Sequence, residues 1–423
     1  MTIDRRKFIQ NSITKTSGVM LAGTLSSCDA SSQISAPPET TYKSMIEGVS
    51  YITKEERLGR IEKARKLMGD QGVDAIYLDS GTSMQYFVDL KWWPSERMMG
   101  VLIPKTGSIY YICPKFEDER LNELISIEGV LRTWEEHESP YELVGKILKE
   151  LKLTSPTIGM EEKVRFFIAN GLRNAIPKST VVDGTPIVAG CRRIKSVSEL
   201  ALMKKANEIT LEAYKIGFSK LEEGMSQYDL DGIVKEAFTG LGAERGGAGS
   251  SFGKYTAFPH GSKEPSKLKE GDNVLIDGGA VVGGYQADIT RTTVFGMPSQ
   301  RQNDIWNVVK EAQTKVYEQA KAGMPCELLD ATARAVVEKS GFGSGYTNFF
   351  HRVGHGIGMD FHEWEYLVKG NKTPMEPGMC FSNEPGIYLY DEFGVRLEDC
   401  WYVTENGYEE FTPQSPSIEN PVS

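Results

Sequence analysis

The sequence predicts two domains, an α/β domain followed by an α+β domain that contains an internal duplication. Short apolar runs alternate with helical periodicity from about residue 55 to 190, which is the pattern of an α/β layer. The pattern changes near residue 196, where two helices, a glycine-rich segment with a histidine and a hairpin follow one another, and this order then recurs. The 423 residues, 40% of them hydrophobic, suffice for two substantial cores.

Composition excludes one class of partner. The formal net charge is −10 and there are no long runs of lysine and arginine. Phosphate binding needs clustered positive charge, so the sequence argues against a nucleic-acid surface. A small or cationic partner is easier to accommodate.

The first 28 residues are predicted to be an export signal. Arg5 and Arg6 precede a weakly apolar stretch from Ile13 to Leu25, which is too short to span a bilayer as a stable helix. This segment resembles a twin-arginine signal; the alternative is a disordered basic tail. The resemblance implies export of the folded chain, and hence a periplasmic location.

Cysteine usage leaves two questions open. Cys28 follows Leu-Ser-Ser, which makes it a candidate for a lipid anchor, with the polar residues 29–50 as a linker. The other cysteines show no C-x-x-C spacing, and most are expected to be buried free thiols. They are Cys113, Cys191, Cys326, Cys380 and Cys400. Cys380 and Cys400 are expected near facing strand positions, where one disulfide is an option.

The α/β domain is assigned to residues 51–190. Its predicted strands lie in residues 72–78, 98–103 and 108–112, and its clearest predicted helices are residues 57–70 and 139–152. Its one histidine, His137, lies in an acidic stretch without other metal-binding side chains, so we interpret it as structural. This domain is expected to support the second domain or to gate its substrate.

The second domain is assigned to residues 191–423. Ser196 and Glu199 form a capping box that begins a helix expected to end near Glu223, and Ser226 begins another. Downstream helices are expected at residues 302–322 and 325–340. The duplication is supported by a loose match of LKEGDNVLIDGG, residues 268–279, to MEPGMCFSNEPG, residues 375–386.

Each half contributes a hairpin with two acids. In LIDGGAVVGGYQADITRT, a turn at residues 281–284 would place Asp277 directly opposite Asp288. In EPGIYLYDEFGVRLED, a turn near residues 390–394 would place Glu384 opposite Glu398. An isolated pair of acids with this spacing more often has one acid near the turn and one on a solvated strand face. The rest of the sequence has to decide between that arrangement and a cation site.

Histidine clustering favours a metal site. Four carboxylates brought together would cost several kcal/mol unless multivalent cations lie between them. Of five histidines, His351, His355 and His362 fall within HRVGHGIGMDFH. Its glycines argue against a helix of the H-E-x-x-H type and favour a loop or strand with close backbone approach to a ligand.

These motifs resemble the pita-bread metallopeptidases, the family of aminopeptidase P, prolidase and methionine aminopeptidase. The resemblance covers residues 190–415, and the preceding α/β segment is similar to the creatinase-like N-terminal domain of aminopeptidase P and prolidase. It is carried by IDGGAVVGGYQADITRT, HRVGHGIGMDFHE, FSNEPGIY and GVRLED. The positions that match the family's metal ligands are Asp277, Asp288, His355, Glu384 and Glu398.

The resemblance implies a dinuclear centre. Asp288 and Glu398 would bridge both ions, Asp277 would chelate one, and His355 with Glu384 would complete the other. Oxygen-rich ligation with one imidazole suits Mn²⁺, with Co²⁺, Fe²⁺ or Zn²⁺ as less selective alternatives. Two ions roughly 3.5 Å apart would share a hydroxide for amide hydrolysis. The family commonly forms dimers or tetramers, so a homo-oligomer is expected.

Further roles follow from the same resemblance. His260 matches a substrate-contacting histidine, and His351 and His362 match histidines that bind substrate and relay protons to the leaving amine. Glu384 matches a glutamate that accepts the proton of water while it remains a ligand. Arg396, two residues before Glu398, would share its strand face and pair with a ligand carboxylate; a surface salt bridge is the alternative.

The leading functional hypothesis is hydrolysis of the bond between a first residue and a penultimate proline, in dipeptides or short peptides. A second hypothesis is a non-peptidase amidohydrolase or lyase on the same fold. A third is a binding protein that has lost catalysis, which the complete set of ligand positions disfavours.

Overall fold

The computed structural model describes residues 42–422. The expected export signal, Cys28 and residues 29–41 of the expected linker lie outside the described residues. Residues 42–50, the rest of that linker, contact the second domain: the Met45 amide donates to the Leu241 carbonyl oxygen at 2.9 Å. Among residues 42–422, no helix has both the length and the hydropathy that a membrane crossing requires.

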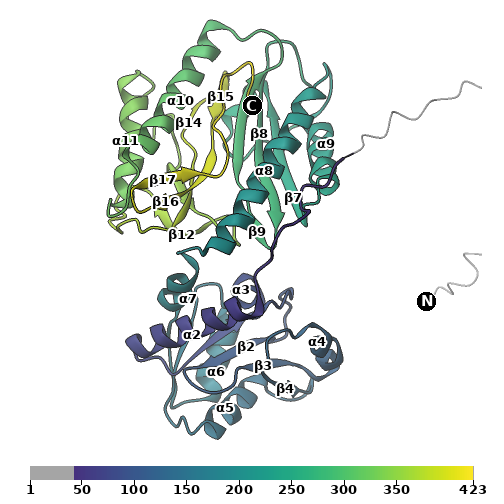
Figure 1. Ribbon diagram of the computed structural model, residues 1–423, viewed down its shortest axis with the longest axis vertical. Coiled ribbons are helices and arrows are strands. Elements are labelled where there is room, and N and C mark those ends of the chain that lie inside the picture. The colour runs from purple at the N-terminus through teal and green to yellow at the C-terminus, as the bar shows by residue number, and fades with distance from the viewer. Residues whose placement is uncertain (1–41, 423) are drawn as a thin grey trace, which may run out of the picture. The chain divides into compact units, whose positions relative to one another are not determined.

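The N-terminal domain is an α/β layer around one mixed sheet, as predicted (Figure 1). Its strands have the order β4-β3-β2-β1-β5-β6. They are β1 (Ala75–Asp79), β2 (Gly100–Pro104), β3 (Tyr110–Pro114), β4 (Val130–Trp134), β5 (Thr157–Met160) and β6 (Thr180–Asp183). The helices are α2 (Lys54–Gln71), α3 (Thr82–Val88), α4 (Asp118–Leu124), α5 (Pro140–Glu150), α6 (Phe166–Ala175) and α7 (Thr185–Arg192), with a 3₁₀ turn, η1 (Lys115–Glu117).

Helices cover both faces of this sheet, which explains its continuous apolar strands. Strands β1, β2 and β3 are buried at every position. Alternate residues enter two different cores: Ile76 and Leu78 pack in one with α2, and Ala75 and Tyr77 pack in the other with α5 and α6. The first core continues into the second domain without interruption, since it also contains residues of its first two helices, such as Leu202.

The second domain contains the predicted helix pairs. Helices α8 (Val197–Ser219) and α9 (Gln227–Gly240) belong to the first half, and α10 (Gln300–Gln319) and α11 (Cys326–Lys339) to the second. The capping box of Ser196 and Glu199 is present, as are boxes at Ser226 and Ser299. The end expected for α8 is wrong by four residues. The chain leaves the helix at Lys220, and the Gly224 amide donates instead to the Leu268 carbonyl oxygen.

The strands of this domain form one sheet in each half and a separate hairpin. The first half contains β7 (Arg245–Phe252), β8 (Asn273–Val282), β9 (Tyr285–Gln286) and β10 (Ile289–Val294), with a 3₁₀ turn, η2 (Gly253–Ala257). The second half contains β11 (Gly354–Gly356), β12 (Glu363–Leu367), β13 (Cys380–Asn383), β14 (Gly386–Leu389), β15 (Phe393–Arg396), β16 (Asp399–Thr404) and β17 (Gly407–Glu410). Figure 1 shows α8 and α9 over the face of β7 and β8. A bridge between Thr290 and Glu398 joins the two halves.

The predicted register of the first hairpin is wrong. Asp277 pairs with Thr290, and Ile289 pairs with Gly278, so Asp288 lies diagonally from Asp277 and not opposite it. The turn is formed by Gly283 and Gly284, both at positive φ, one residue later than expected. Paired glycines suit a two-residue turn of this kind, because both central residues then take positive φ.

The register of the second hairpin agrees with the prediction. The pairs Asn383 with Asp399 and Gly386 with Arg396 belong to two separate ladders that keep one register. Glu384 and Glu398 lie in the gap between these ladders, at the level where that register sets them opposite each other. The gap frees both residues from regular strand pairing at the place where their side chains are needed.

The cysteines confirm the free-thiol expectation and exclude the suggested disulfide. All five cysteines within residues 42–422 are free and buried. Cys380 pairs with Tyr402, and Cys400 pairs with Ser382, so the two sulfurs are not opposed. The thiol of Cys400 instead lies 3.1 Å from the Asp288 carbonyl oxygen, to which it donates.

Burial predicts how these thiols react. It raises the pKa of each of them, to about 12 for Cys113 and Cys326, and a protonated, inaccessible thiol is a poor nucleophile. In a Cys28→Ser variant we expect no reaction of the native protein with a thiol reagent and reaction of five thiols after denaturation. Two fewer thiols in the denatured protein would show that a disulfide had formed.

Candidate metal centre

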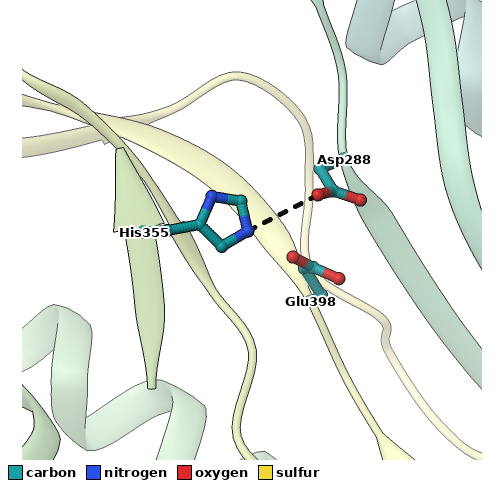
Figure 2. Close-up of side chains that lie close together, drawn as sticks. All are labelled: Asp288, His355 and Glu398. Carbon is teal, nitrogen blue, oxygen red and sulfur yellow. Dashed lines mark ion pairs between the residues drawn. The ribbon is translucent and has the colours of Figure 1, made fainter. Parts of the chain in front are cut away.

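Three side chains from separate segments converge in the second domain. Ligand atoms of Asp288, His355 and Glu398 all lie within 4.8 Å of one another, and all three residues are buried (Figure 2). Asp288 lies just before β10, His355 is in β11, and Glu398 lies between β15 and β16. The two halves of the domain therefore both contribute to the cluster.

The imidazole of His355 presents a lone pair to two acids. Its Nδ1 lies 3.0 Å from the Gly356 carbonyl oxygen, which can only accept, so Nδ1 carries the hydrogen. Nε2 is then an acceptor, 3.6 Å from Asp288 Oδ2 and 3.4 Å from Glu384 Oε1. Burial lowers the pKa of His355 to about 3, which keeps the ring neutral. Three acceptors facing one another suit a cation between them.

Glu384 and Asp277 extend the cluster on two sides. Glu384 Oε1 is also 3.3 Å from Ser382 Oγ, which donates to it. Thr290 Oγ1 lies 2.7 Å from Asp277 Oδ1 and 2.7 Å from Glu398 Oε2. The hydroxyl therefore links these two acids. The five positions expected to bind metal thus lie together: Glu384 and Asp288 contact His355, Thr290 links Asp277 to Glu398, and Glu398 lies within 4.8 Å of Asp288 and His355.

Electrostatics give a second sign of a cation site. Burial, followed by mutual repulsion, raises the pKa of Asp288 and of Glu398 well above their usual values. The pKa of Glu384 is raised to about 7, again first by burial. Glu398 Oε1 is buried without a hydrogen-bond partner among the described residues. An oxygen-rich donor set with one neutral imidazole, short of positive charge, fits divalent cations such as Mn²⁺.

Within residues 42–422, Arg396 is the one guanidinium that forms ion pairs with carboxylates of the cluster. Its Nη2 lies 2.8 Å from Asp277 Oδ2, and its Nε donates to Thr290 Oγ1 at 2.9 Å. The side chain is buried, so the surface salt bridge considered as its alternative is excluded. Arg396 Nη1 also donates to Tyr388 Oη at 3.0 Å. The arginine fixes Asp277 and Thr290 relative to the hairpin of β14 and β15.

His351 is joined to Arg396 through Tyr388. His351 Nδ1 donates to the Arg352 carbonyl oxygen at 2.8 Å, so its Nε2 accepts from Tyr388 Oη at 2.7 Å. Burial lowers the pKa of His351 to about 3. Nδ1 is also 3.7 Å from Glu384 Oε2. A neutral His351 therefore stands beside the cluster, with both ring nitrogens engaged.

The other two histidines expected at the site lie at its surface. The rings of His362 and His355 are 3.9 Å apart between centroids, and His362 is exposed. Burial of its inner face and the charge of Arg352 lower the pKa of His362. His260 is exposed and lines a cavity of about 310 Å³ together with Asp277 and Arg396. His137 is exposed on the N-terminal domain, and its interpretation as structural stays a prediction.

Two residues of the site were missed in the sequence. Thr290 follows Asp288 by two positions, so strand alternation places it on the same face and could have identified it. Tyr388 likewise lies on β14, two residues after Gly386, which pairs with Arg396 of β15. Neither residue is titratable near neutral pH, so neither has the chemistry of a metal ligand or a general base.

A buried network of ion pairs holds the segment that carries His362. The Glu363 carboxylate lies 3.0 Å from Lys195 Nζ and forms a closer ion pair with Arg192 of α7. Arg192 also binds Asp360 at 2.7 Å. Although burial alone would raise it, these cations lower the pKa of Glu363 to about 2. The N-terminal domain thus supplies charge that holds the segment around His362.

A pH effect on the metal-free protein follows from Glu384. Its pKa rises from 4.5 in the unfolded chain to about 7 in the folded one, so its contribution to stability is full below pH 4.5 and is lost as the pH rises to 7. We expect the free energy of unfolding, measured in EDTA, to fall over this pH range by on the order of 3 kcal/mol. Glu384→Gln should remove that part of the pH dependence; an unchanged slope would assign it to other groups.

The fold and this cluster together define a metalloenzyme. Residues 201–405 match the model of metallopeptidase family M24, and residues 60–194 match that of the creatinase/prolidase N-terminal domain. An uncharacterized peptidase of Schizosaccharomyces pombe is 33% identical, over 88% of this chain and 83% of its own. The Xaa-Pro dipeptidase of Lactobacillus helveticus is 31% identical, over 83% of this chain and 96% of its own.

Solved structures agree with these matches. The prolidase from Thermococcus sibiricus superposes with a TM-score of 0.79 at 29% identity, covering 86% of this chain and 98% of its own. The chain belongs to metallopeptidase family M24, with a creatinase-like N-terminal domain and a pita-bread catalytic domain. The fold expected from the resemblance is therefore confirmed, as is the class of enzyme, a peptidase that uses divalent metal ions.

Proposed function

We propose that the protein hydrolyses the bond between an N-terminal residue and a penultimate proline, as an Xaa-Pro dipeptidase or aminopeptidase. The observation that carries the proposal is the cluster of Asp288, His355 and Glu398, which both halves of the domain build together. Relatives named Xaa-Pro dipeptidase and prolidase, which match most of this chain and nearly all of their own length, supply the substrate class.

We propose that two divalent ions, most favourably Mn²⁺, bind between the five ligand residues. Asp288 and Glu398 would contact both ions, Asp277 one, and His355 with Glu384 the other. Co²⁺, Fe²⁺ and Zn²⁺ remain alternatives, because the donor set does not exclude them. When bound, the ions supply Lewis-acid activation of water and of the scissile carbonyl group.

The protein groups around the ions have separate roles in this proposal. Glu384, whose pKa is raised to about 7 by burial in the metal-free site, is placed to accept a proton from the attacking water. His260 lines the cavity, and exposed His362 lies against the His355 ring; both are proposed to contact the scissile amide and its leaving nitrogen. Arg396 holds Asp277 in its orientation through the 2.8 Å ion pair.

His351 is proposed to act through its hydrogen bonds. Tyr388 donates to its Nε2 at 2.7 Å and accepts from Arg396, and these two hydrogen bonds fix the orientation of the ring. A pKa near 3 makes His351 a poor proton store by itself. It binds substrate and orients Tyr388, and His362 is the better placed proton donor.

The test is a substrate series with metal quantification. We expect the purified protein, supplied with Mn²⁺, to cleave Xaa-Pro dipeptides or Xaa-Pro-Xaa peptides, and the relative rates to separate a dipeptidase from an aminopeptidase. A matched Xaa-Ala series is the control for proline selectivity. Turnover of neither proline series would overturn the proposal. Activity of metal-free protein on a small amide would favour the non-peptidase alternative.

We also propose export by the twin-arginine route, on the basis of Arg5 and Arg6, and a periplasmic location. Replacing both arginines by lysine should hold the protein in the cytoplasm, measured by cell fractionation. Cys28 is proposed as a lipid anchor; Cys28→Ser should then release the protein from the membrane fraction. A homo-oligomer is expected from light scattering of the purified protein.

A further inference from the structure

The cavity beside Asp277 contains an acid that the catalytic cluster does not use. The cavity measures about 310 Å³ and is bounded on one side by His260, Asp277 and Arg396, and on another by Asp231 of α9. Phe258 and Tyr228 add aromatic walls, and both are substantially exposed, at 42% and 57%. A substrate bound at the metal ligands therefore has an adjoining space with a carboxylate at its side.

Asp231 lacks a counter-ion. Its Oδ1 accepts a hydrogen bond from the Ser250 amide at 2.7 Å, and no lysine, arginine or histidine forms an ion pair with it within residues 42–422. The residue is half-buried, and burial raises its pKa, which the hydrogen bonding from Ser250 opposes only in part. A carboxylate held in a cavity without a cation gains stabilisation when a cation binds there.

The position of Asp231 favours a side chain over the α-ammonium group as the ligand. Asp277 lies on β8, which pairs with the edge strand β7, where Gly249 stands opposite it. Asp231 accepts a hydrogen bond from the amide of the next residue, Ser250, which points away from β8. The Asp231 carboxylate therefore lies on the far side of β7, and adjacent strands are roughly 4.8 Å apart. A group close to the scissile bond does not extend that far, whereas a long side chain does.

We propose that this cavity binds the cationic side chain of the substrate's N-terminal residue, so that peptides beginning with lysine or arginine are preferred. This inference rests on the proposed function and adds the substrate class. Asp231 pairs with the ammonium or guanidinium group, and the aromatic faces of Tyr228 and Phe258 lie along the aliphatic stem and stabilise the charge. The net charge of −10 favours approach of the same cationic peptides.

The experiment compares two side chains of similar length that differ in charge. Lys-Pro and Met-Pro, together with Lys-Pro-Ala and Met-Pro-Ala, are assayed with the Mn²⁺-loaded full chain and with Asp231→Asn. The asparagine keeps a side-chain oxygen for the Ser250 amide and removes only the charge. Glu236→Gln, an exposed acid on the same helix outside the cavity, controls for the change in overall charge.

We expect wild type to prefer the lysine peptides, mainly through KM. Asp231→Asn should lower kcat/KM for the lysine peptides by about 10-fold to 100-fold, as for loss of a charged hydrogen bond, and leave the methionine peptides within about twofold. Glu236→Gln should change neither. An equal loss for both peptides in Asp231→Asn, or no lysine preference in wild type, would overturn the inference while leaving the Xaa-Pro activity standing. Absence of turnover with every peptide would overturn both.

Discussion

Asp288→Ala is expected to lose both divalent ions and all peptidase activity, although it removes one carboxylate. Asp288 Oδ2 lies 3.6 Å from His355 Nε2, and an Asp288 carboxylate oxygen lies within 4.8 Å of one of Glu398. If Asp288 contacts both ions, neither site stays complete without it, and the remaining acids are too weakly organised to hold an ion. Metal content after gel filtration, measured by mass spectrometry, is the readout.

The control for this variant is Asp304→Ala, an exposed acid of α10 that lies apart from the site. It should keep the metal content and the activity of wild type. Circular dichroism of Asp288→Ala in EDTA, compared with metal-free wild type, separates loss of metal from loss of fold. Two ions retained in Asp288→Ala would refute the bridging role, and one retained ion would make Asp288 a ligand of a single ion.

Asp399→Asn is expected to destabilise the fold by roughly 3 to 5 kcal/mol, the usual effect of removing one partner of a buried ion pair. Asp399 and Arg291 are both fully buried, and Asp399 Oδ1 lies 2.5 Å from Arg291 Nη2. Gln313 donates to the other carboxylate oxygen at 3.0 Å. Without the aspartate charge, the guanidinium remains inside the protein with no compensating anion. Urea unfolding measures the loss.

An exposed ion pair of the second half provides the matched control. Arg301 Nε lies 2.6 Å from Glu392 Oε2, and about half of each side chain is exposed. Glu392→Gln should therefore change the free energy of unfolding by only about 0 to 1 kcal/mol. Arg291 Nη1 also donates to the Glu398 carbonyl oxygen at 2.8 Å, so Asp399→Asn should weaken metal binding as well. Equal stability of the two variants would show that the interior tolerates the unpaired guanidinium.

The two hairpins show what the sequence could and could not specify. In both, the acids and their order were evident, because carboxylates in strands of otherwise apolar character stand out. Register depends on the position of a turn to within one residue. In the second hairpin the predicted pairing was correct; in the first, the Gly283-Gly284 pair carried the signal for the turn, and a turn placed one residue too early moved Asp288 from a diagonal to a facing position.

Contacts between distant segments had no signal in a single sequence. The Tyr388 hydroxyl group lies between His351 and Arg396, and nothing in its own strand indicates these two partners. Arg192 is unremarkable in its own segment, yet its side chain is 1% exposed and neutralises acids about 170 positions later. Such partners depend on tertiary packing, which periodicity and motif spacing do not describe.

The ion network beneath His362 limits how this enzyme could be divided or recombined. The Asp360 carboxylate forms ion pairs with Arg192 and Lys163 and accepts a hydrogen bond from the Thr82 hydroxyl, and all three partners come from the N-terminal domain. A shortened chain that began after α7 would keep only Lys195 to balance Asp360 and Glu363. A catalytic domain produced alone would therefore lose the contacts that hold the segment around His362, and a chimera with a foreign N-terminal domain would need one that supplies matching cations.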